Sequence, residues 1–216
     1  MKAGWLASLG LLGVSTSVFN FDSTAPGGMP SGWVTAMTNA GGPPKWEVIK
    51  DTTAPSPPYV FAQISRDGAN ARFPLAILDK PVLQNGEISV RMKPVSGRED
   101  QAGGLVWRYR GPNDYYLVRA NALENNVVLY RVDGGQRTPL APKGASSNTY
   151  GVKHAVPPNT WIILKVTFKG PVFNVYFNHR RLFQVEDRGY QGSGKVGLWT
   201  KADSVTYFDD FRVAGK

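Results

Sequence analysis

The sequence contains no cysteine and only two histidines in 216 residues. Without cysteine, the chain has no disulfide, zinc–cysteine site, thiol nucleophile or lipid anchor at a cysteine. Its fold must therefore rest on the hydrophobic core alone. His154 and His179 do not have metal-ligand spacing, and no G-x-S-x-G motif accompanies either of them. A serine-hydrolase triad is not supported.

Helical periodicity is almost absent after residue 17, and short runs that alternate apolar and polar residues take its place. The 24 glycines and 16 prolines fit a turn-rich chain. Asp133-Gly134-Gly135 and Asn178-His179 are turn signals between such runs. About a dozen strands are expected, which predicts an all-β sandwich.

The first 17 residues have the features of a signal peptide. Lys2 supplies the positive end, Ala3 to Val14 is apolar, and Ser15 and Ser17 are small residues of the kind found at cleavage sites. The apolar run is too short to span a membrane. No linker or repeat divides the remainder, so we expect one exported domain, periplasmic or secreted, over residues 18–216.

Basic residues outnumber acidic ones, 25 to 16, which gives a formal net charge of +9. Such a balance attracts nucleic acid, anionic glycans or membrane surfaces. The lysines and arginines are scattered, however, and no established nucleic-acid module is present. We interpret the charge as a general excess of basic residues over the whole chain. No nucleic-acid partner is expected, and an anionic polymer is a secondary alternative.

Two short strands are expected at the C-terminal end, Val196–Trp199 and Val205–Val213, joined by the turn Thr200–Ser204. The turn brings Lys201 and Asp203 next to Trp199, an arrangement that suits either a ligand site or a solvated hairpin turn. Asp209 interrupts the alternation of the second strand, which indicates a β-bulge near Asp209 and Asp210.

A second hairpin is expected around Arg110–Asp114. Trp107 and Tyr116 fall on its core-facing parity. The opposite parity carries polar and cationic groups, so we expect an exposed face with Arg108, Tyr115, Arg119 and Asn121.

Three motifs carry a family resemblance: G-K-V-G-L-W-T-K-A-D-S followed by F-D-D-F, the segment Gly103 to Asn121, and N-V-V-L-Y-R-V at 126–132. The chain resembles bacterial proteins of the concanavalin A-like lectin/glucanase superfamily. That group is close to laminin-G-like domains and to the three-keto-disaccharide hydrolase domain. The resemblance implies a jelly-roll β-sandwich of two antiparallel sheets, and it implies a fold more strongly than an activity.

Glycoside hydrolysis usually needs two carboxylates across the scissile bond. Glucanases of this superfamily carry them as E-x-D-x-x-E or E-x-D-x-E, and none of the five glutamates here stands in that pattern. Asp209 and Asp210 are adjacent and would point to opposite faces of a regular strand. Calcium, common in laminin-G-like domains, would need several convergent oxygens, with Asp203 and Asp209 as the candidate ligands. No other cofactor is expected.

Carbohydrate binding is the function that these residues favour, because sugars are held by aromatic stacking and a few oriented polar groups. The candidate ligand-binding residues are Arg108, Tyr115, Arg119, Asn121, Trp199, Lys201 and Asp203. Trp199 fits a place in the core as well as a place in the site. Two alternatives remain open: a glycoside hydrolase or lyase-like enzyme acting on a sugar derivative, and an adhesion domain that recognises protein.

Overall fold

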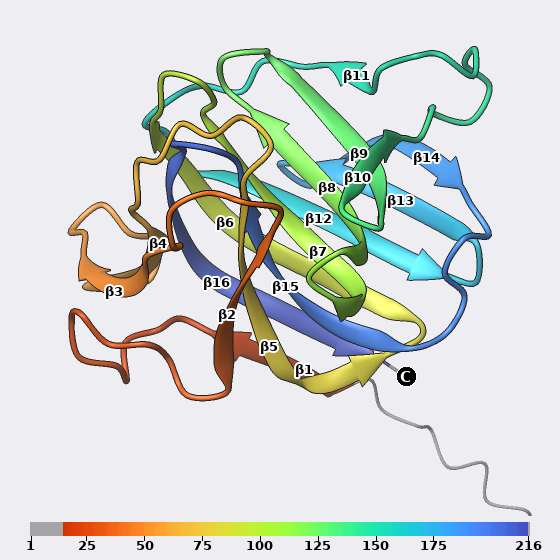
Figure 1. The fold of residues 1–216 in the computed structure, drawn as a ribbon. Coiled ribbons are helices and arrows are strands. Elements are labelled where there is room, and N and C mark those ends of the chain that lie inside the picture. The colour runs from red at the N-terminus through yellow and green to blue at the C-terminus, as the bar shows by residue number, and fades with distance from the viewer. Residues whose placement is uncertain (1–14, 216) are drawn as a thin grey trace, which may run out of the picture.

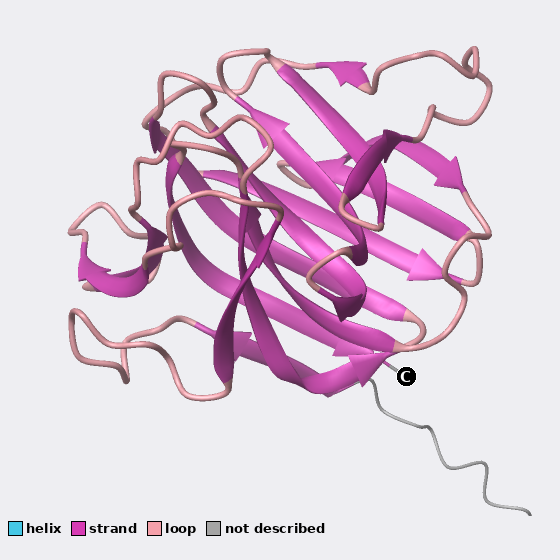
Figure 2. Ribbon diagram, in the orientation of Figure 1, coloured by secondary structure: helices cyan, strands magenta, loops and turns pink. Residues whose placement is uncertain are grey.

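The computed structural model describes residues 15–215. Within that range the regular secondary structure consists of β-strands, without a helix (Figure 2). A membrane-spanning helix is likewise absent from this range. The strands form two antiparallel sheets that pack face to face (Figure 1). The sequence-based prediction of an all-β sandwich is confirmed.

Sheet A has eight strands. Along the sheet they run β14 (Arg180–Glu186), β13 (Val172–Phe177), β12 (Ile162–Lys169), β6 (Gly86–Ser96), β16 (Val205–Gly215), β4 (Tyr59–Gln63) and β3 (Trp46–Lys50), with β1 (Ser15–Phe19) also paired to β16. β4 pairs with the first part of β16 and β1 with its last part.

Sheet B also has eight strands. Along the sheet they run β10 (Gln136–Pro139), β9 (Asn126–Asp133), β8 (Asp114–Asn121), β7 (Ala102–Gly111), β15 (Gly194–Thr200), β5 (Phe73–Leu83) and β2 (Trp33–Thr38), with β11 (Val152–Lys153) also paired to β9. Strands distant in sequence thus lie side by side, as β15 does between β5 and β7.

The main core fills the space between the two sheets. In β12, residues alternate between buried and half-buried, so Leu164 and Val166 face the core while Lys165 faces outward. Trp107 and Tyr116, which were predicted to face the core, belong to it and are buried, as is Phe211. Period-two patterning therefore identified the inner face of β7 and β8 at these two positions.

Two tight turns fix the register of their hairpins. Gly134 and Gly135 have φ of 53° and 81°, and Asn178 and His179 have φ of 44° and 69°. Positive φ at both central residues is the geometry of a type I′ turn, which matches the twist of antiparallel strands. Both turns were predicted from the sequence.

The N-terminal strand begins inside the segment that the sequence predicts to be a signal peptide. β1 starts at Ser15 and pairs with the end of β16. The predicted signal peptide lies outside the described residues as far as residue 14. Its last three residues belong to β1.

The bulge predicted in the last strand is present. The pairing of β16 with β6 shifts register between Asp209 and Arg212, and Asp210 has a φ of 47°. The extra residue lets both Asp209 and Asp210 point towards Ser56 in the β3–β4 loop.

Candidate functional site

The outer face of sheet B carries a second apolar cluster. In β8, seven consecutive residues are buried, so both faces of this strand are covered. Phe73 and Trp199 pack here with ring centroids 5.5 Å apart. The cluster comprises Phe73, Leu75, Ile77, Ala102, Val106, Tyr115, Leu117, Val128, Tyr130, Val132 and Trp199.

Both edge strands of sheet B reach over this cluster. At the end of β2, Thr38 donates a hydrogen bond to the carbonyl of Pro112 in the β7–β8 turn. Because its only proton is used there, Thr38 accepts from the Tyr115 hydroxyl at 2.8 Å. From β10, the Arg137 guanidinium lies over the rings of Phe73 and Trp199. The sheet curls until its two edges approach each other.

The sequence predicted that Tyr115, Arg119 and Asn121 lie on a solvent-exposed face, and the exposure is wrong. All three side chains do point away from the main core, as expected, but all are buried. Trp199 is also fully buried, and its indole nitrogen has no hydrogen-bond partner. Neither Trp199 nor Tyr115 presents a ring to solvent.

Arg119 is the centre of a polar network at one end of this face. Its Nη2 donates to Glu124 Oε2 at 2.9 Å, to the Tyr150 hydroxyl at 3.0 Å and to the Tyr130 hydroxyl at 3.2 Å. Its Nη1 donates to Asn126. Burial would lower the pKa of Arg119, but the surrounding Tyr and Glu oxygens raise it above its usual value. The guanidinium is thus a fixed cation beneath the surface.

The network continues through Asn121 to Lys201. The Asn121 amide donates to Glu124 at 2.9 Å and to Asp100 at 2.7 Å. Lys201 Nζ lies 2.8 Å from the other oxygen of Asp100, whose side chain is only 3% exposed. Arg119, Asn121 and Lys201, predicted to share one site, are joined by these contacts. Asp100 uses one of the three N–H donors of the Lys201 ammonium, whose side chain is mostly buried.

Two members of this network reach the surface, and sequence reasoning missed both. Tyr150, from the β10–β11 connection, is 47% exposed, although its hydroxyl is held by Arg119 and Tyr130. The Glu124 side chain is 38% exposed. Burial would raise the pKa of Glu124, but Arg119 and Asn126 lower it below its usual value, so the carboxylate is ionised at neutral pH.

Asp203 anchors a loop. Its carboxylate accepts backbone hydrogen bonds from Arg98 at 2.6 Å, Asp100 at 3.0 Å and Glu99 at 3.1 Å. Partial burial would raise the pKa of Asp203, but these three N–H donors lower it below its usual value. The carboxylate positions Asp100, and through it Lys201.

Arg108 lies away from the other candidate residues. A register shift after Trp107 gives Arg108 a φ of 49°, and its side chain turns to the inner side of the sheet, over the ring of Phe173. There its guanidinium donates to the backbone carbonyls of Tyr190, Gln84 and Gly170. The expectation that Arg108 shares an exposed face with Arg119 is wrong, because the bulge reverses the alternation.

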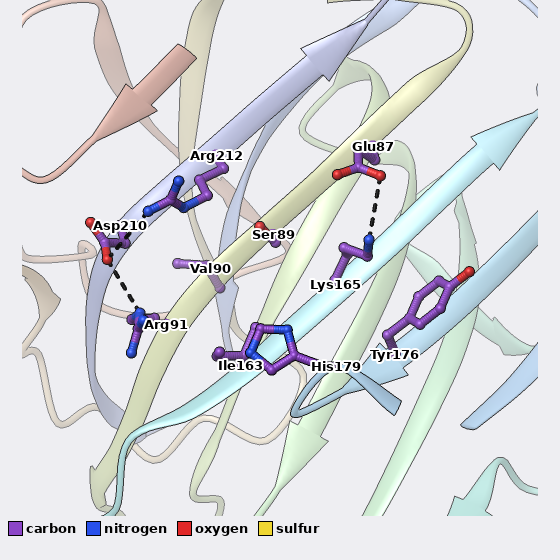
Figure 3. A pocket seen from close by; sticks show the side chains of 10 residues that line it. All are labelled: Glu87, Ser89, Val90, Arg91, Ile163, Lys165, Tyr176, His179, Asp210 and Arg212. Carbon is purple, nitrogen blue, oxygen red and sulfur yellow. Dashed lines mark hydrogen bonds and ion pairs between the residues drawn. The ribbon is translucent and has the colours of Figure 1, made fainter. Parts of the chain in front are cut away.

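A shallow groove of about 440 Å³ crosses the outer face of sheet A (Figure 3). Its charged groups satisfy one another: Lys165 lies 3.4 Å from Glu87, and Arg91 lies 3.2 Å from Asp210. The aromatic ring of Tyr176 has the ammonium of Lys165 4.7 Å from its centroid. The groove is open, but its principal polar groups already have partners.

Asp209 beside this groove has an unusual environment. It is fully buried, and its oxygens accept backbone hydrogen bonds from Ser56 and Asp210, each at 2.7 Å. Burial, with the nearby charges of Asp210 and Asp22, raises its pKa to about 6. This carboxylate links the β3–β4 loop to β16 through Ser56.

No metal-binding group forms within residues 15–215, where no three His, Asp or Glu side chains converge. The two predicted calcium ligands, Asp203 and Asp209, both use their oxygens on backbone N–H groups. The residues present therefore do not fit a calcium site.

The chain matches no protein-family model and no curated protein. Among solved structures, it is similar to the carbohydrate-binding module CBM66 from Bacillus subtilis, with a TM-score of 0.63, 18% identity, and coverage of 84% of this chain and 94% of that one. The cellulose-induced protein Cip1 gives a TM-score of 0.67 at 11% identity, covering 93% and 97%.

The GH43 protein BlXynB from Bacillus licheniformis, solved as a mutant, gives a TM-score of 0.53 at 14% identity. That match covers 79% of this chain but only 37% of the other, so the similarity concerns part of the larger protein. At these identities the comparisons show a lectin-like β-sandwich fold.

Proposed function

We propose that this chain is an exported β-sandwich that binds a polysaccharide or cell-envelope glycan at the Tyr150 end of the outer face of sheet B. The sequence motifs resemble those of the concanavalin A-like lectin/glucanase superfamily, and this resemblance supports a carbohydrate as the ligand. So does the presence of a carbohydrate-binding module among proteins of similar fold. The signal-peptide features of residues 1–17 support export.

The observation that supports this proposal most directly is that Tyr150 has an exposed ring held in a fixed position. Its hydroxyl bonds to Arg119 and Tyr130, so the ring is held before a ligand arrives. Sugar rings pack their apolar faces on such aromatic platforms, and preorganisation reduces the entropy lost on binding. Beside it, the half-exposed carboxylate of Glu124 is an acceptor for sugar hydroxyls.

The groove on sheet A is the less suitable place for a neutral sugar. A ligand there would have to separate the Glu87–Lys165 and Arg91–Asp210 pairs, and would find Tyr176 already covered. Protein adhesion is also less supported. Within the described part of the chain, the exposed large apolar residues come from separate segments of the sequence and are Val18, Met29, Val34, Val82, Leu123 and Tyr150.

A glycan array followed by calorimetric titration tests the proposal. For the best glycan, Tyr150→Ala should weaken binding by about tenfold or more, because the ring contact is lost. Tyr150→Phe should weaken it less, since the ring remains. Tyr176→Ala, a half-buried tyrosine in the groove of sheet A, is the matched control and should bind like the parent.

Two results would count against this proposal. Equal binding by the parent and Tyr150→Ala, with a loss in Tyr176→Ala, would move the site to sheet A. Release of reducing ends from the bound glycan would support the enzyme alternative.

A further inference from the structure

Arg137 is a cation on an aromatic surface with an unused hydrogen-bond donor. Its guanidinium carbon lies 4.5 Å from the ring centroid of Phe73, 4.9 Å from that of Tyr130 and 5.6 Å from that of Trp199. Its Nη1 is buried and has no hydrogen-bond partner. Contact with ring faces stabilises the charge in part, but a buried N–H without an acceptor is unfavourable.

A cavity of about 410 Å³ opens beside this guanidinium, within the range of small-molecule sites. Three exposed amide side chains border it: Asn39 after β2, Asn70 before β5, and Gln136 in β10. Amides both donate and accept hydrogen bonds, as sugar hydroxyls do. Phe73 and Arg137 also line it.

The cavity is held in shape by contacts between distant loops. Asn39 Nδ2 donates to the carbonyl of Ala71 at 2.9 Å and to that of Gly135 at 3.2 Å. Gly135 has a φ of 81°, and a Cβ there would lie 2.7 Å from Asn39 Oδ1. A larger residue would displace Asn39, so the sequence Gly-Gly-Gln-Arg builds both the turn and the pocket wall.

We infer that this pocket binds an acidic sugar residue through its carboxylate. Arg137 lines the pocket and is only half-buried, so a carboxylate can reach the accessible side of its planar guanidinium, and one cation matches one negative charge. The amides suit the hydroxyls of the same ring. The net charge of +9 favours approach of an acidic glycan. The inference rests on the proposed function, since it assumes that the ligand is a glycan.

The test uses a galacturonate trimer and its methyl ester, which has the same rings without the charges. Calorimetric titration at pH 7 should show the acid binding about ten- to a hundredfold more tightly than the ester to the parent protein. Arg137→Gln should remove that preference. The matched control is Arg188→Gln, which removes the same charge from a side chain that is 70% exposed.

Asn70→Ala provides a second variant, because this exposed side chain lies outside the ring cluster and its loss should leave the fold intact. It should weaken binding of the acid severalfold. Equal binding of acid and ester by the parent, or an unchanged preference in Arg137→Gln, would overturn the inference and leave the proposed function standing. Failure of every acidic and neutral glycan to bind would overturn both.

Discussion

Asp209→Asn is the substitution whose effect on stability depends most clearly on pH. Asp209 is fully buried, and its pKa is raised from a usual 3.8 to about 6. The folded chain therefore holds this proton more tightly than the unfolded chain. Its contribution to stability is complete below about pH 4 and is lost as the pH rises through about 6.

The size of the effect follows from the shift in pKa. A change of about two pKa units corresponds to roughly 3 kcal/mol. Asp209→Asn removes this dependence, because an amide does not titrate. At pH 4 the variant should be less stable than the parent by roughly 1–3 kcal/mol, because both oxygens of the protonated acid can accept from the two backbone donors whereas the amide nitrogen of Asn cannot accept. Near pH 7 this loss of stability in the variant should be offset, because ionisation of buried Asp209 destabilises the parent there and the variant has no such group.

Urea unfolding followed by tryptophan fluorescence at several pH values between 4 and 7.5 measures the difference. Asp51, Asp67 and Asp203 have pKa values below the usual 3.8, so their contribution to stability is nearly complete at pH 4 and is lost only as the pH falls further. The difference between variant and parent cancels these contributions. A difference that stays constant across the pH range would refute the assigned environment of Asp209.

Three further predictions follow from packing and processing. Phe211→Ala should lower the free energy of unfolding by roughly 3–5 kcal/mol, because Phe211 is fully buried between the sheets; a smaller loss in urea unfolding would contradict this. Lys201→Ala should cost roughly 1–3 kcal/mol in the same assay, because buried Asp100 keeps only Asn121; an unchanged midpoint would show that the ion pair is unimportant. N-terminal sequencing of protein from the native host should give a chain that begins near Val18, whereas an intact Met1 would exclude processing.

The main core was predictable because strand alternation is a local property. Trp107 and Tyr116 were assigned to the core from parity alone, and the bulge at Asp209 from a break in parity. The same dependence on local alternation led to the wrong prediction for Arg108. A bulge that the sequence did not signal reversed its direction.

The closure of sheet B could not be predicted from local pattern. Polar residues on the outer parity of β8 indicated solvent, but Thr38 meets Tyr115 from 77 positions away in the chain. Arg137 stands just after a turn in a short polar strand, which is a typical surface position. Only the curvature of the whole sheet brings it over Trp199.

A crystal structure of the protein with its best-binding glycan tests the central claim most directly. We predict a sugar ring packed on Tyr150, with a hydroxyl bonded to Glu124, and Arg119 unmoved beneath them. A glycan seated instead in the groove between Tyr176 and Arg212 on sheet A would contradict the account.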